Sequence, residues 1–168
     1  MSFGRSTSVV EHSSGFALRP VGEDDAEFLY SLYASTRTEE LAVTGWSDEQ
    51  KESFLRNQFL AQTTHYQTYF ADGTFDVILL QGNPIGRLYV HSTERKSHIV
   101  DIALLPEFRG QGIGSNLIRE LQESCATSGR ALSIHVEKFN PALNLYNRLG
   151  FTTEGDEGVY WYMEWKPQ

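Results

Sequence analysis

The sequence predicts a single α/β domain with a mixed central sheet, and three observations carry this prediction. The chain has 168 residues, of which 40% are hydrophobic, so it can bury one sizeable core. Segments of helical periodicity alternate with short β-rich segments. Their order is strand, two helices, three strands, helix, strand, helix and two strands, which is typical of an α/β layer.

The first element begins near Phe16, and we expect residues 1–14 to form a mobile N-terminal tail in front of one domain that covers residues 15–168. This tail lacks the apolar core of a signal peptide. The single Cys125 cannot form an internal disulfide. We therefore expect a cytoplasmic protein, and no apolar run approaches the ~20 residues that a membrane helix needs.

Charge and ligand spacing exclude two further classes of function. With 14 Lys plus Arg against 22 Asp plus Glu, the net charge is −8, which makes nonspecific binding to nucleic acid a poor candidate. We expect neither a nucleic acid nor a membrane partner. The histidines outside the strand over 132–137 lack metal-ligand spacing, so no metal is expected; they are His12, His65, His91 and His98.

The N-terminal half contains a strand and two helices. Phe16–Arg19 is predicted as a strand that Pro20 ends. Asp24 or Asp25 is placed to cap the first helix. The second helix begins at Ser47, where Gln50 completes a capping box, and it is expected to end near Thr63. The stretch between these two helices is predicted to be irregular.

The next three elements are strands. Phe75–Leu80 and Ile85–His91 form a predicted hairpin around the turn dipeptide Gly82-Asn83. Ile99–Leu105 is a nearly continuous apolar run with one acid, Asp101, which suits a central strand that is covered on both faces.

The C-terminal third alternates helices and strands. The helix after residue 112 is predicted to bury one apolar face, made of Ile113, Leu117, Ile118, Leu121 and Cys125, and to end at Gly129. Leu132–Glu137 alternates as a strand. Asn140 is predicted to cap the next helix, which ends at Gly150. A final hairpin joins Phe151–Glu154 to Val159–Trp165 through a turn over 155–158.

A glycine loop, Arg109-x-x-Gly112-x-Gly114, lies between the central strand and the following helix. Glycines at a helix N-terminus leave backbone N–H groups uncovered, which suits a pyrophosphate. A dinucleotide fingerprint, with Glu137 as the ribose-binding acid, is disfavoured because Ser115 replaces the third glycine. A Walker loop would need a Gly-Lys-Ser/Thr sequence, which is missing. A purely structural turn remains open.

The glycine loop resembles a motif of the GNAT superfamily of N-acetyltransferases when two later segments are read with it. The segments are Leu104–Gly114, Asn140–Ala142 and Leu145–Phe151, and the resemblance covers about residues 75–165. It implies a largely antiparallel sheet flanked by helices, with splayed strands that form an acetyl-CoA cleft. It also implies an acetyl-CoA-dependent N-acetyltransferase that moves the acetyl group directly to a primary amine, with acetyl-CoA as co-substrate.

The resemblance also implies which residues bind the co-substrate. Backbone groups of Ile102, Ala103 and Leu104 would face the pantetheine and the thioester. The pyrophosphate would be held by main-chain N–H groups of Arg109, Gly110, Gln111, Gly112, Ile113 and Gly114. An N–H group at Leu104 or Leu105 would stabilise the oxyanion. Asn140 would touch the pantetheine arm, although it lies six residues before Tyr146 rather than the family's usual seven.

The catalytic groups are expected on three elements. The resemblance makes Tyr146 the general acid for the departing thiolate, in contact with the cofactor. An attacking ammonium must lose a proton, and His135 or Glu137 is the candidate base, with Asp101 as a further possibility. A hydrogen-bonded structural histidine and an acid that orients a loop are the alternatives for His135 and Asp101.

The resemblance also implies where the acceptor binds, which is at the first two helices, their connection and the final hairpin. The candidate substrate-binding residues are Tyr33, Glu39, Glu40, Trp46 and Tyr160. An acidic, aromatic rim favours a cationic amine, on a small molecule or a peptide; acids that only serve helix dipoles are the alternative. The competing function is a non-catalytic acyl-CoA-binding or sensing module. A homodimer that pairs Val159–Trp165 across a two-fold axis is a further expectation.

Overall fold

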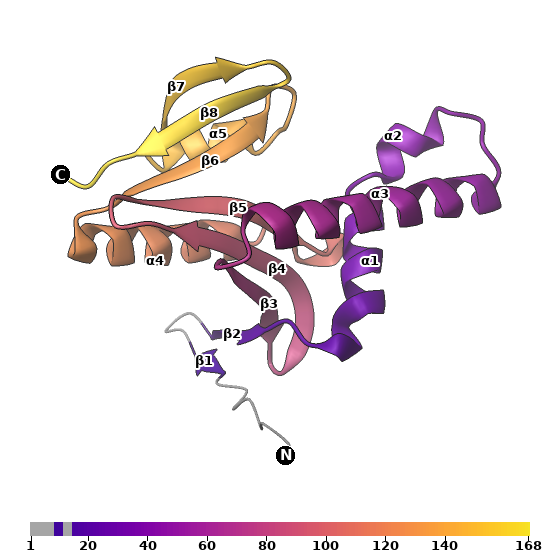
Figure 1. Cartoon of the computed structure of the whole chain (residues 1–168), viewed down its shortest axis with the longest axis horizontal. Coiled ribbons are helices and arrows are strands. Elements are labelled where there is room, and N and C mark those ends of the chain that lie inside the picture. Colours follow the sequence, from indigo (N-terminus) through magenta and orange to yellow (C-terminus); the bar gives the residue numbers. More distant parts are fainter. Residues whose placement is uncertain (1–8, 12–14) are drawn as a thin grey trace. The chain divides into compact units, whose positions relative to one another are not determined.

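The structure is a computed structural model that describes residues 9–11 and 15–168 (Figure 1). The described chain divides into two compact units. The first contains the residues up to Arg87 together with Ala103–Glu107, and the second contains Leu88–Ile102 and Phe108–Gln168. Strands β4 (Asn83–Ser92) and β5 (Lys96–Leu104) contribute residues to both units.

The strands of the first unit follow the order β1-β2-β3-β4. β2 (Phe16–Pro20) pairs antiparallel with β1 (Val10–Glu11) and β3 (Thr74–Leu80). β2 and β3 confirm the strands predicted over 16–19 and 75–80. β1 lies within the segment that we expected to be a mobile tail, so this expectation is wrong for residues 10–11. The rest of that segment, residues 1–8 and 12–14, lies outside the described residues.

The first helix, α1 (Ala26–Ser35), follows a short 3-10 turn, η1 (Glu23–Asp25). Asp25 occupies the predicted cap position, but its carboxylate does not cap α1. It accepts hydrogen bonds from the Gly22 N–H at 2.7 Å and from two Arg19 nitrogens at 2.7 and 2.8 Å. The Arg19 guanidinium therefore lowers the pKa of Asp25, and the ion pair ties β2 to the start of α1.

Helix α3 (Asp48–Tyr69) begins with the predicted capping box, because the Ser47 hydroxyl accepts from the Gln50 N–H and the Gln50 side chain accepts from the Ser47 N–H. It ends at Tyr69 rather than near Thr63, since no glycine or proline interrupts the intervening residues. The stretch predicted to be irregular contains a further short helix, α2 (Thr38–Ala42). A buried cluster of Tyr30, Tyr33, Leu41 and Leu55 joins these helices.

The hairpin between β3 and β4 turns one residue earlier than predicted. Gln81 and Gly82 occupy the turn with φ of +50° and +80°, and Asn83 already belongs to β4. Two successive positive φ angles match the twist of an antiparallel hairpin, and glycine adopts such a φ without strain.

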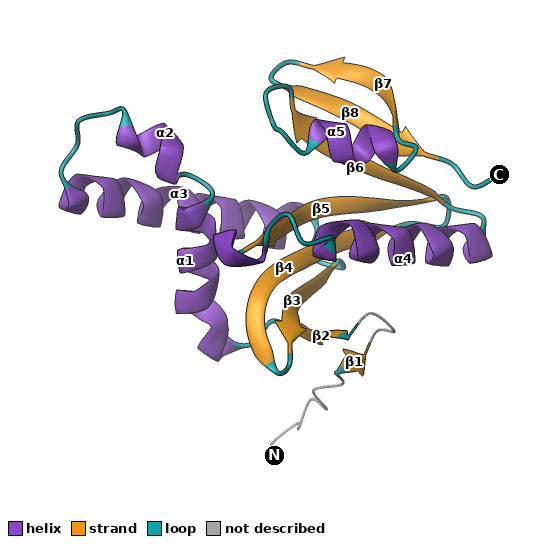
Figure 2. Cartoon of the chain, turned by 180° about the vertical axis from the view of Figure 1, so that it is seen from behind, coloured by secondary structure: helices purple, strands orange, loops and turns teal. Residues whose placement is uncertain are grey.

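The second unit contains a sheet of order β4-β5-β6-β8-β7 (Figure 2). β6 (Ala131–Glu137) is parallel to β5, whereas β8 (Tyr160–Trp165) is antiparallel to both β6 and β7 (Thr152–Glu157). The sheet is therefore mixed, as predicted. Because β8 already pairs on both of its edges, the expected pairing of Val159–Trp165 with a second copy is wrong. The turn of this hairpin is also shorter than predicted, since β7 extends to Glu157.

Helix α4 (Ile113–Ser128) ends at Gly129, which adopts φ +70° as predicted. Four of its five predicted core residues are buried, whereas Leu121 is half-buried and the buried Gln122 donates to the Leu149 carbonyl at 2.8 Å. Helix α5 (Leu143–Arg148) starts later than predicted: Asn140 Oδ1 accepts from the Ala142 N–H at 2.9 Å and forms a turn before the helix. None of the helices in the described ranges has the length and apolarity that would carry it across a membrane.

Candidate active site

The glycine loop follows the 3-10 turn η2 (Pro106–Phe108) and leads into α4. Gly110 and Gly112 have φ of +72° and +84°, a backbone region that favours glycine. The first bond of the helix runs from the Asn116 N–H to the Gly112 carbonyl at 3.0 Å. The N–H groups of the preceding three residues, 113–115, therefore have no acceptor within the helix, and they point out of its N-terminus.

This helix N-terminus differs in charge from the three in the first unit. Each of those has acidic residues in its first turn, whereas the first turn of α4 has none, and Gly112 offers no side chain as a cap. The partial positive charge of the α4 N-terminus is thus uncompensated within its own first turn. In a chain of net charge −8, this arrangement leaves a local site for an anion.

Gly114 tests whether the loop is only a structural turn. Its φ lies outside the positive range, and a Cβ built on it meets no atom of the described residues within 4 Å. Neither backbone conformation nor packing among these residues requires a glycine there. The open surface on the first turn of α4 allows a close approach by an anionic group, so the pyrophosphate of coenzyme A fits this loop.

The end of β5 approaches β4 closely within the first unit. A Cβ on Gly86 would lie 2.3 Å from the Ala103 carbonyl oxygen, so glycine is required there. The Leu105 N–H donates to the Ile85 carbonyl oxygen at 2.8 Å. The prediction that Leu105 donates to the oxyanion is therefore wrong, because its amide N–H already donates to Ile85.

In the second unit, β5 and β6 part after a short parallel stretch. The register between them runs from Lys96 opposite Ala131 to Ile99 opposite Ile134. Both strands continue, and the residues beyond this stretch include Asp101 on β5 and His135 and Glu137 on β6. The splayed strands that the resemblance implies thus have a counterpart here, and the candidate bases lie beyond the point where the pairing ends.

Tyr146 is a buried tyrosine on α5 with 5% of its surface exposed. Its ring packs edge-on against Phe151, with centroids 5.7 Å apart. Burial, and secondly the negative charge of Asp101, raises the pKa of Tyr146 from 10.0 to about 12. The phenol is consequently protonated at neutral pH and can donate a hydrogen bond.

His135 is the most exposed of the candidate bases. Its Nε2 contacts Glu157 Oε2, and its Nδ1 lies 3.3 Å from His98 Nε2. Its ring is also 5.2 Å from that of Tyr162 and 6.5 Å from that of Tyr160. The structure therefore brings two predicted residues together, the base candidate His135 and the acceptor candidate Tyr160.

The other candidates of this unit occupy less exposed places. Glu137 is half-buried, and its carbonyl oxygen accepts from the Asn140 N–H at 2.9 Å. Asp101 is also half-buried and acts electrostatically on Tyr146. The charge of Asp101 thus acts on Tyr146, the predicted acid.

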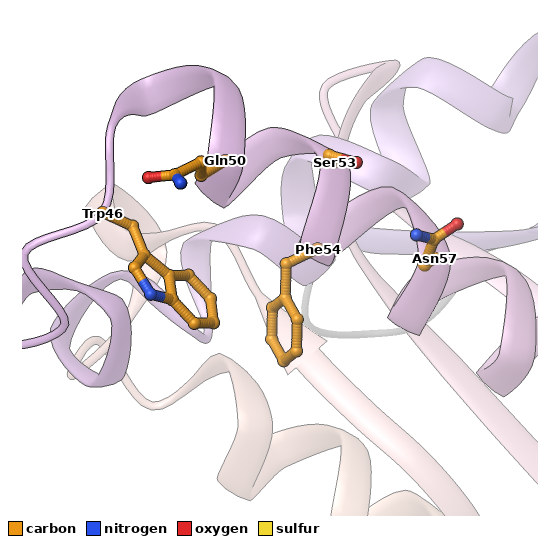
Figure 3. A pocket seen from close by; sticks show the side chains of 5 residues that line it. All are labelled: Trp46, Gln50, Ser53, Phe54 and Asn57. Atoms are coloured by element: carbon orange, nitrogen blue, oxygen red, sulfur yellow. The ribbon is translucent and has the colours of Figure 1, made fainter.

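The remaining predicted acceptor residues belong to the first unit. Tyr33 is only 5% exposed, because its ring packs on Phe59 within the core, so it does not lie on an exposed rim. Glu39 and Glu40 are exposed on α2, and Glu40 is 3.1 Å from Arg37. Trp46 packs edge-on against Phe54 and lines a shallow hollow with three polar residues of α3, Gln50, Ser53 and Asn57 (Figure 3).

The structure links His135 to His98, and His98 to Ser133, through hydrogen bonds between their side chains. The sequence analysis gave no role to His98 or Ser133. Their Cα atoms are register partners on adjacent strands. The alternation of each strand is visible in the sequence, but the register between strands is not. Among the described residues, no group of three or more His, Cys, Asp and Glu side chains is placed to hold a metal ion.

The chain resembles known proteins in sequence and in structure. The profile of the acetyltransferase (GNAT) family matches residues 27–151. A protein of Bacillus subtilis (strain 168), assigned as a ribosomal protein bS18-alanine N-acetyltransferase, is 29% identical over 147 residues, 86% of each chain. An N-alpha-acetyltransferase of Sulfurisphaera tokodaii is 35% identical over 60 residues, 34% of this chain and 36% of that protein.

Solved structures share the fold. The PaiA N-acetyltransferase of Thermoplasma acidophilum, crystallised in complex with coenzyme A, superposes with a TM-score of 0.66 at 22% identity. The match covers 90% of this chain and 98% of that one. The family profile, the mixed sheet flanked by helices and the glycine loop before α4 agree, and the chain belongs to the acetyltransferase (GNAT) family.

Proposed function

We propose that this acetyltransferase transfers the acetyl group of acetyl-CoA to the α-amine of a peptide or protein N-terminus. The observation that carries the co-substrate is the N-terminus of α4, with its positive-φ glycines, its open surface at Gly114 and no acid in its first turn. Main-chain N–H groups of this turn would hold the pyrophosphate, with Arg109, Gly110 and Gln111 in the loop before it.

Two considerations favour an α-amine over a side-chain amine. Two relatives have names that specify such an acceptor, an alanine N-acetyltransferase and an N-alpha-acetyltransferase. An α-amino group has a pKa of ~7.7–8.0 against ~10.4 for a lysine side chain, so a larger share of it is already neutral at pH 7. A single exposed imidazole is then a sufficient base. Small cationic amines are the second acceptor class.

The reaction needs one group to accept a proton and one to donate. When bound, acetyl-CoA supplies an activated thioester carbonyl. We assign His135 as the base because it is the exposed candidate and lies beside Tyr160, and because the Glu157 carboxylate at its ring would stabilise the imidazolium. Its ring accepts a proton from the incoming ammonium, and the freed electron pair of the amine then attacks.

Tyr146 is assigned as the hydrogen-bond donor to the departing sulfur. A phenol whose pKa is raised to about 12 keeps its proton throughout the physiological range. Complete transfer of that proton to a thiolate with an ordinary pKa of ~8.5 would cost about 5 kcal/mol. The proton is therefore shared with the sulfur as charge develops there, which narrows the predicted general-acid role to hydrogen-bond donation.

Calorimetric titration with acetyl-CoA, and with NADH as control, tests the co-substrate. We expect acetyl-CoA to bind and NADH to give no signal. A transfer assay then compares an alanine-initiated peptide with the same peptide blocked at its N-terminus, and only the free peptide should be acetylated. Binding of acetyl-CoA without transfer to any amine would favour a sensing module. Absence of acetyl-CoA binding would overturn the proposal.

A further inference from the structure

Three large apolar side chains are exposed at one end of the sheet in the second unit. Phe139 is 98% exposed, Val159 is 67% exposed and Tyr160 is 40% exposed. Phe139 lies in the turn after β6, and Val159 lies in the turn between β7 and β8; Figure 1 shows both turns at the same end of this sheet. We call these three residues the apolar tip. Large apolar side chains gathered at a surface are typical of a binding site.

The two turns of the apolar tip are bonded to each other. The Lys138 N–H donates to the Val159 carbonyl oxygen at 3.0 Å. The Lys138 ammonium pairs with Asp156 on β7 at 2.5 Å and lies 4.2 Å from the ring centroid of Trp161 on β8. These contacts brace the backbone directly before Phe139, so its ring is held at the surface. They also pair the positive charge of Lys138 with an acid.

Carboxylates flank the apolar tip on two strands. Tyr160 on β8 has Glu137 of β6 and Glu157 of β7 as its register partners. Register partners project from the same face of a sheet, so both acids share a face with the Tyr160 ring. The ring of His135, the proposed base, is 6.5 Å from that of Tyr160. An apolar surface and negative charge beside the base are complementary to an ammonium group that lies close to an apolar side chain.

Spacing along β6 indicates which part of an acceptor reaches the apolar tip. Lys138, which is bonded to Val159, lies three positions beyond His135, a span of about 10 Å in extended backbone. A peptide in extended conformation advances by about 3.3 Å for each residue. A peptide whose α-amine lies at His135 and whose chain follows β6 therefore brings its second and third side chains to Phe139 and Val159.

We propose that the apolar tip selects the acceptor by binding a large apolar side chain at the second or third residue of the peptide. The proposal rests on the proposed function, because it takes the α-amine of a peptide as the acceptor. Phe139 and Val159 determine specificity in it and take no part in the transfer. A second copy of the chain fits this surface less well, because its own Glu137 and Glu157 would add like charges.

The test compares two alanine-initiated peptides of equal length and composition. The first has leucine at positions two and three and serine at its last two positions, and in the second these leucines and serines are exchanged. Both peptides have the same charge and the same α-amine. We expect kcat/KM for the first peptide to exceed that for the second by about 5–20-fold, mainly through KM, because the contact forms equally in the ground state and the transition state.

Variants of the apolar tip assign this preference to its residues. Phe139→Ala and Val159→Ala should each bring the ratio of the two kcat/KM values closer to one. Phe139→Leu should keep most of the ratio, because the side chain remains large and apolar. Tyr69→Ala, at the end of α3, removes a ring that is 68% exposed and is the matched control that should leave the ratio unchanged. Because all of these side chains are exposed, the variants should unfold at the temperature of the natural protein.

The outcomes separate this proposal from the proposed function. Equal kcat/KM values for the two peptides in the natural protein overturn the selection, and so does a ratio that both alanine variants leave unchanged. If the protein acetylates no peptide, the proposed function fails by its own assay, and calorimetric titration with the first peptide decides the inference. Weaker binding by Phe139→Ala than by the natural protein then supports the contact, whereas equal binding or none overturns it.

Sedimentation velocity distinguishes a second copy from a peptide as the occupant of the apolar tip. We expect the same sedimentation coefficient for the natural protein and for Phe139→Ala. A dimer that this substitution dissociates would assign the apolar tip to contact between copies of the chain and would overturn the proposal.

Discussion

At the scale of single residues, Tyr146 illustrates how burial sets chemistry. The ring is packed against Phe151, and its surroundings favour the neutral phenol. The same burial that makes the hydroxyl a weak acid guarantees that it carries a proton when a donor is needed. Position in the core and chemical role are thus compatible, although a core tyrosine and a catalytic tyrosine look alike in the sequence.

Replacing Tyr146 by Phe removes the hydroxyl and keeps the ring. We expect kcat to fall about 10²–10³-fold, because a hydrogen bond made in the transition state is lost. The affinity for acetyl-CoA should stay within about twofold, since the glycine loop is unchanged. Steady-state kinetics together with calorimetry measure both quantities. An unchanged kcat would remove Tyr146 from the mechanism.

The raised pKa of Tyr146 also predicts a pH dependence of stability. The folded protein keeps this proton up to a pKa of about 12, whereas an unfolded tyrosine loses it near its ordinary value of 10.0. Between these values the unfolded state binds fewer protons, so the free energy of unfolding falls as pH rises, by about 3 kcal/mol at most.

Urea unfolding from pH 9 to pH 12 measures this loss against the variant Tyr146→Phe, which has no such proton. The two proteins share every other titrating group. The free energy of unfolding of the natural protein, relative to that of the variant, should therefore fall steadily as pH rises through this window. A constant difference would mean that the Tyr146 phenol is not shielded from water.

At the scale of elements, the glycine loop and α4 separate ligand binding from stability. Alanine has a higher helix propensity than glycine, and a Cβ at Gly114 meets no described atom within 4 Å. We therefore expect Gly114→Ala to stabilise the fold by about 0.5–1 kcal/mol while it weakens acetyl-CoA binding at least tenfold. Thermal unfolding measures the change in stability, and calorimetry measures the change in acetyl-CoA affinity. Unchanged affinity would mean that no ligand approaches this turn closely.

Gly86 on β4 is expected to behave in the opposite way. Its missing Cβ makes room for the Ala103 carbonyl, 2.3 Å from where that atom would lie. Gly86→Ala should cost about 1–3 kcal/mol, because the two strand backbones must move apart. Gly22→Ala is the matched control, with its nearest described atom 3.8 Å away and an extended backbone. Equal stability of the two variants in denaturant unfolding would contradict this account.

At the scale of the whole molecule, the net charge of −8 bears on the acceptor. Exposed Glu39 and Glu40 add to this negative field, which attracts a cationic peptide over distances comparable to the Debye length. We expect kcat/KM for a lysine-containing peptide to fall several-fold between about 20 mM and about 200 mM salt. A neutral peptide of the same length should respond little. Equal responses would exclude charge as a determinant of the acceptor.

Much of the fold could be predicted from local patterns. The capping box at Ser47, the αL glycine after α4 and the strand over 132–137 depend on residues that are neighbours in the chain, and all three are confirmed. The errors concern places where no local signal exists. α2 was missed, α3 extends further than expected, and the helix after Asn140 begins two residues beyond the predicted start.

The sequence by itself determined the class of the fold and the glycine loop, because both arise from periodicity and from residue types at fixed spacing. Tertiary structure alone decided which side chains meet. It buried Tyr33 in the core, bound the Leu105 N–H to Ile85, and placed His98 between Ser133 and His135. Strand register and packing set these contacts, and both depend on pairings between residues that are far apart in the chain.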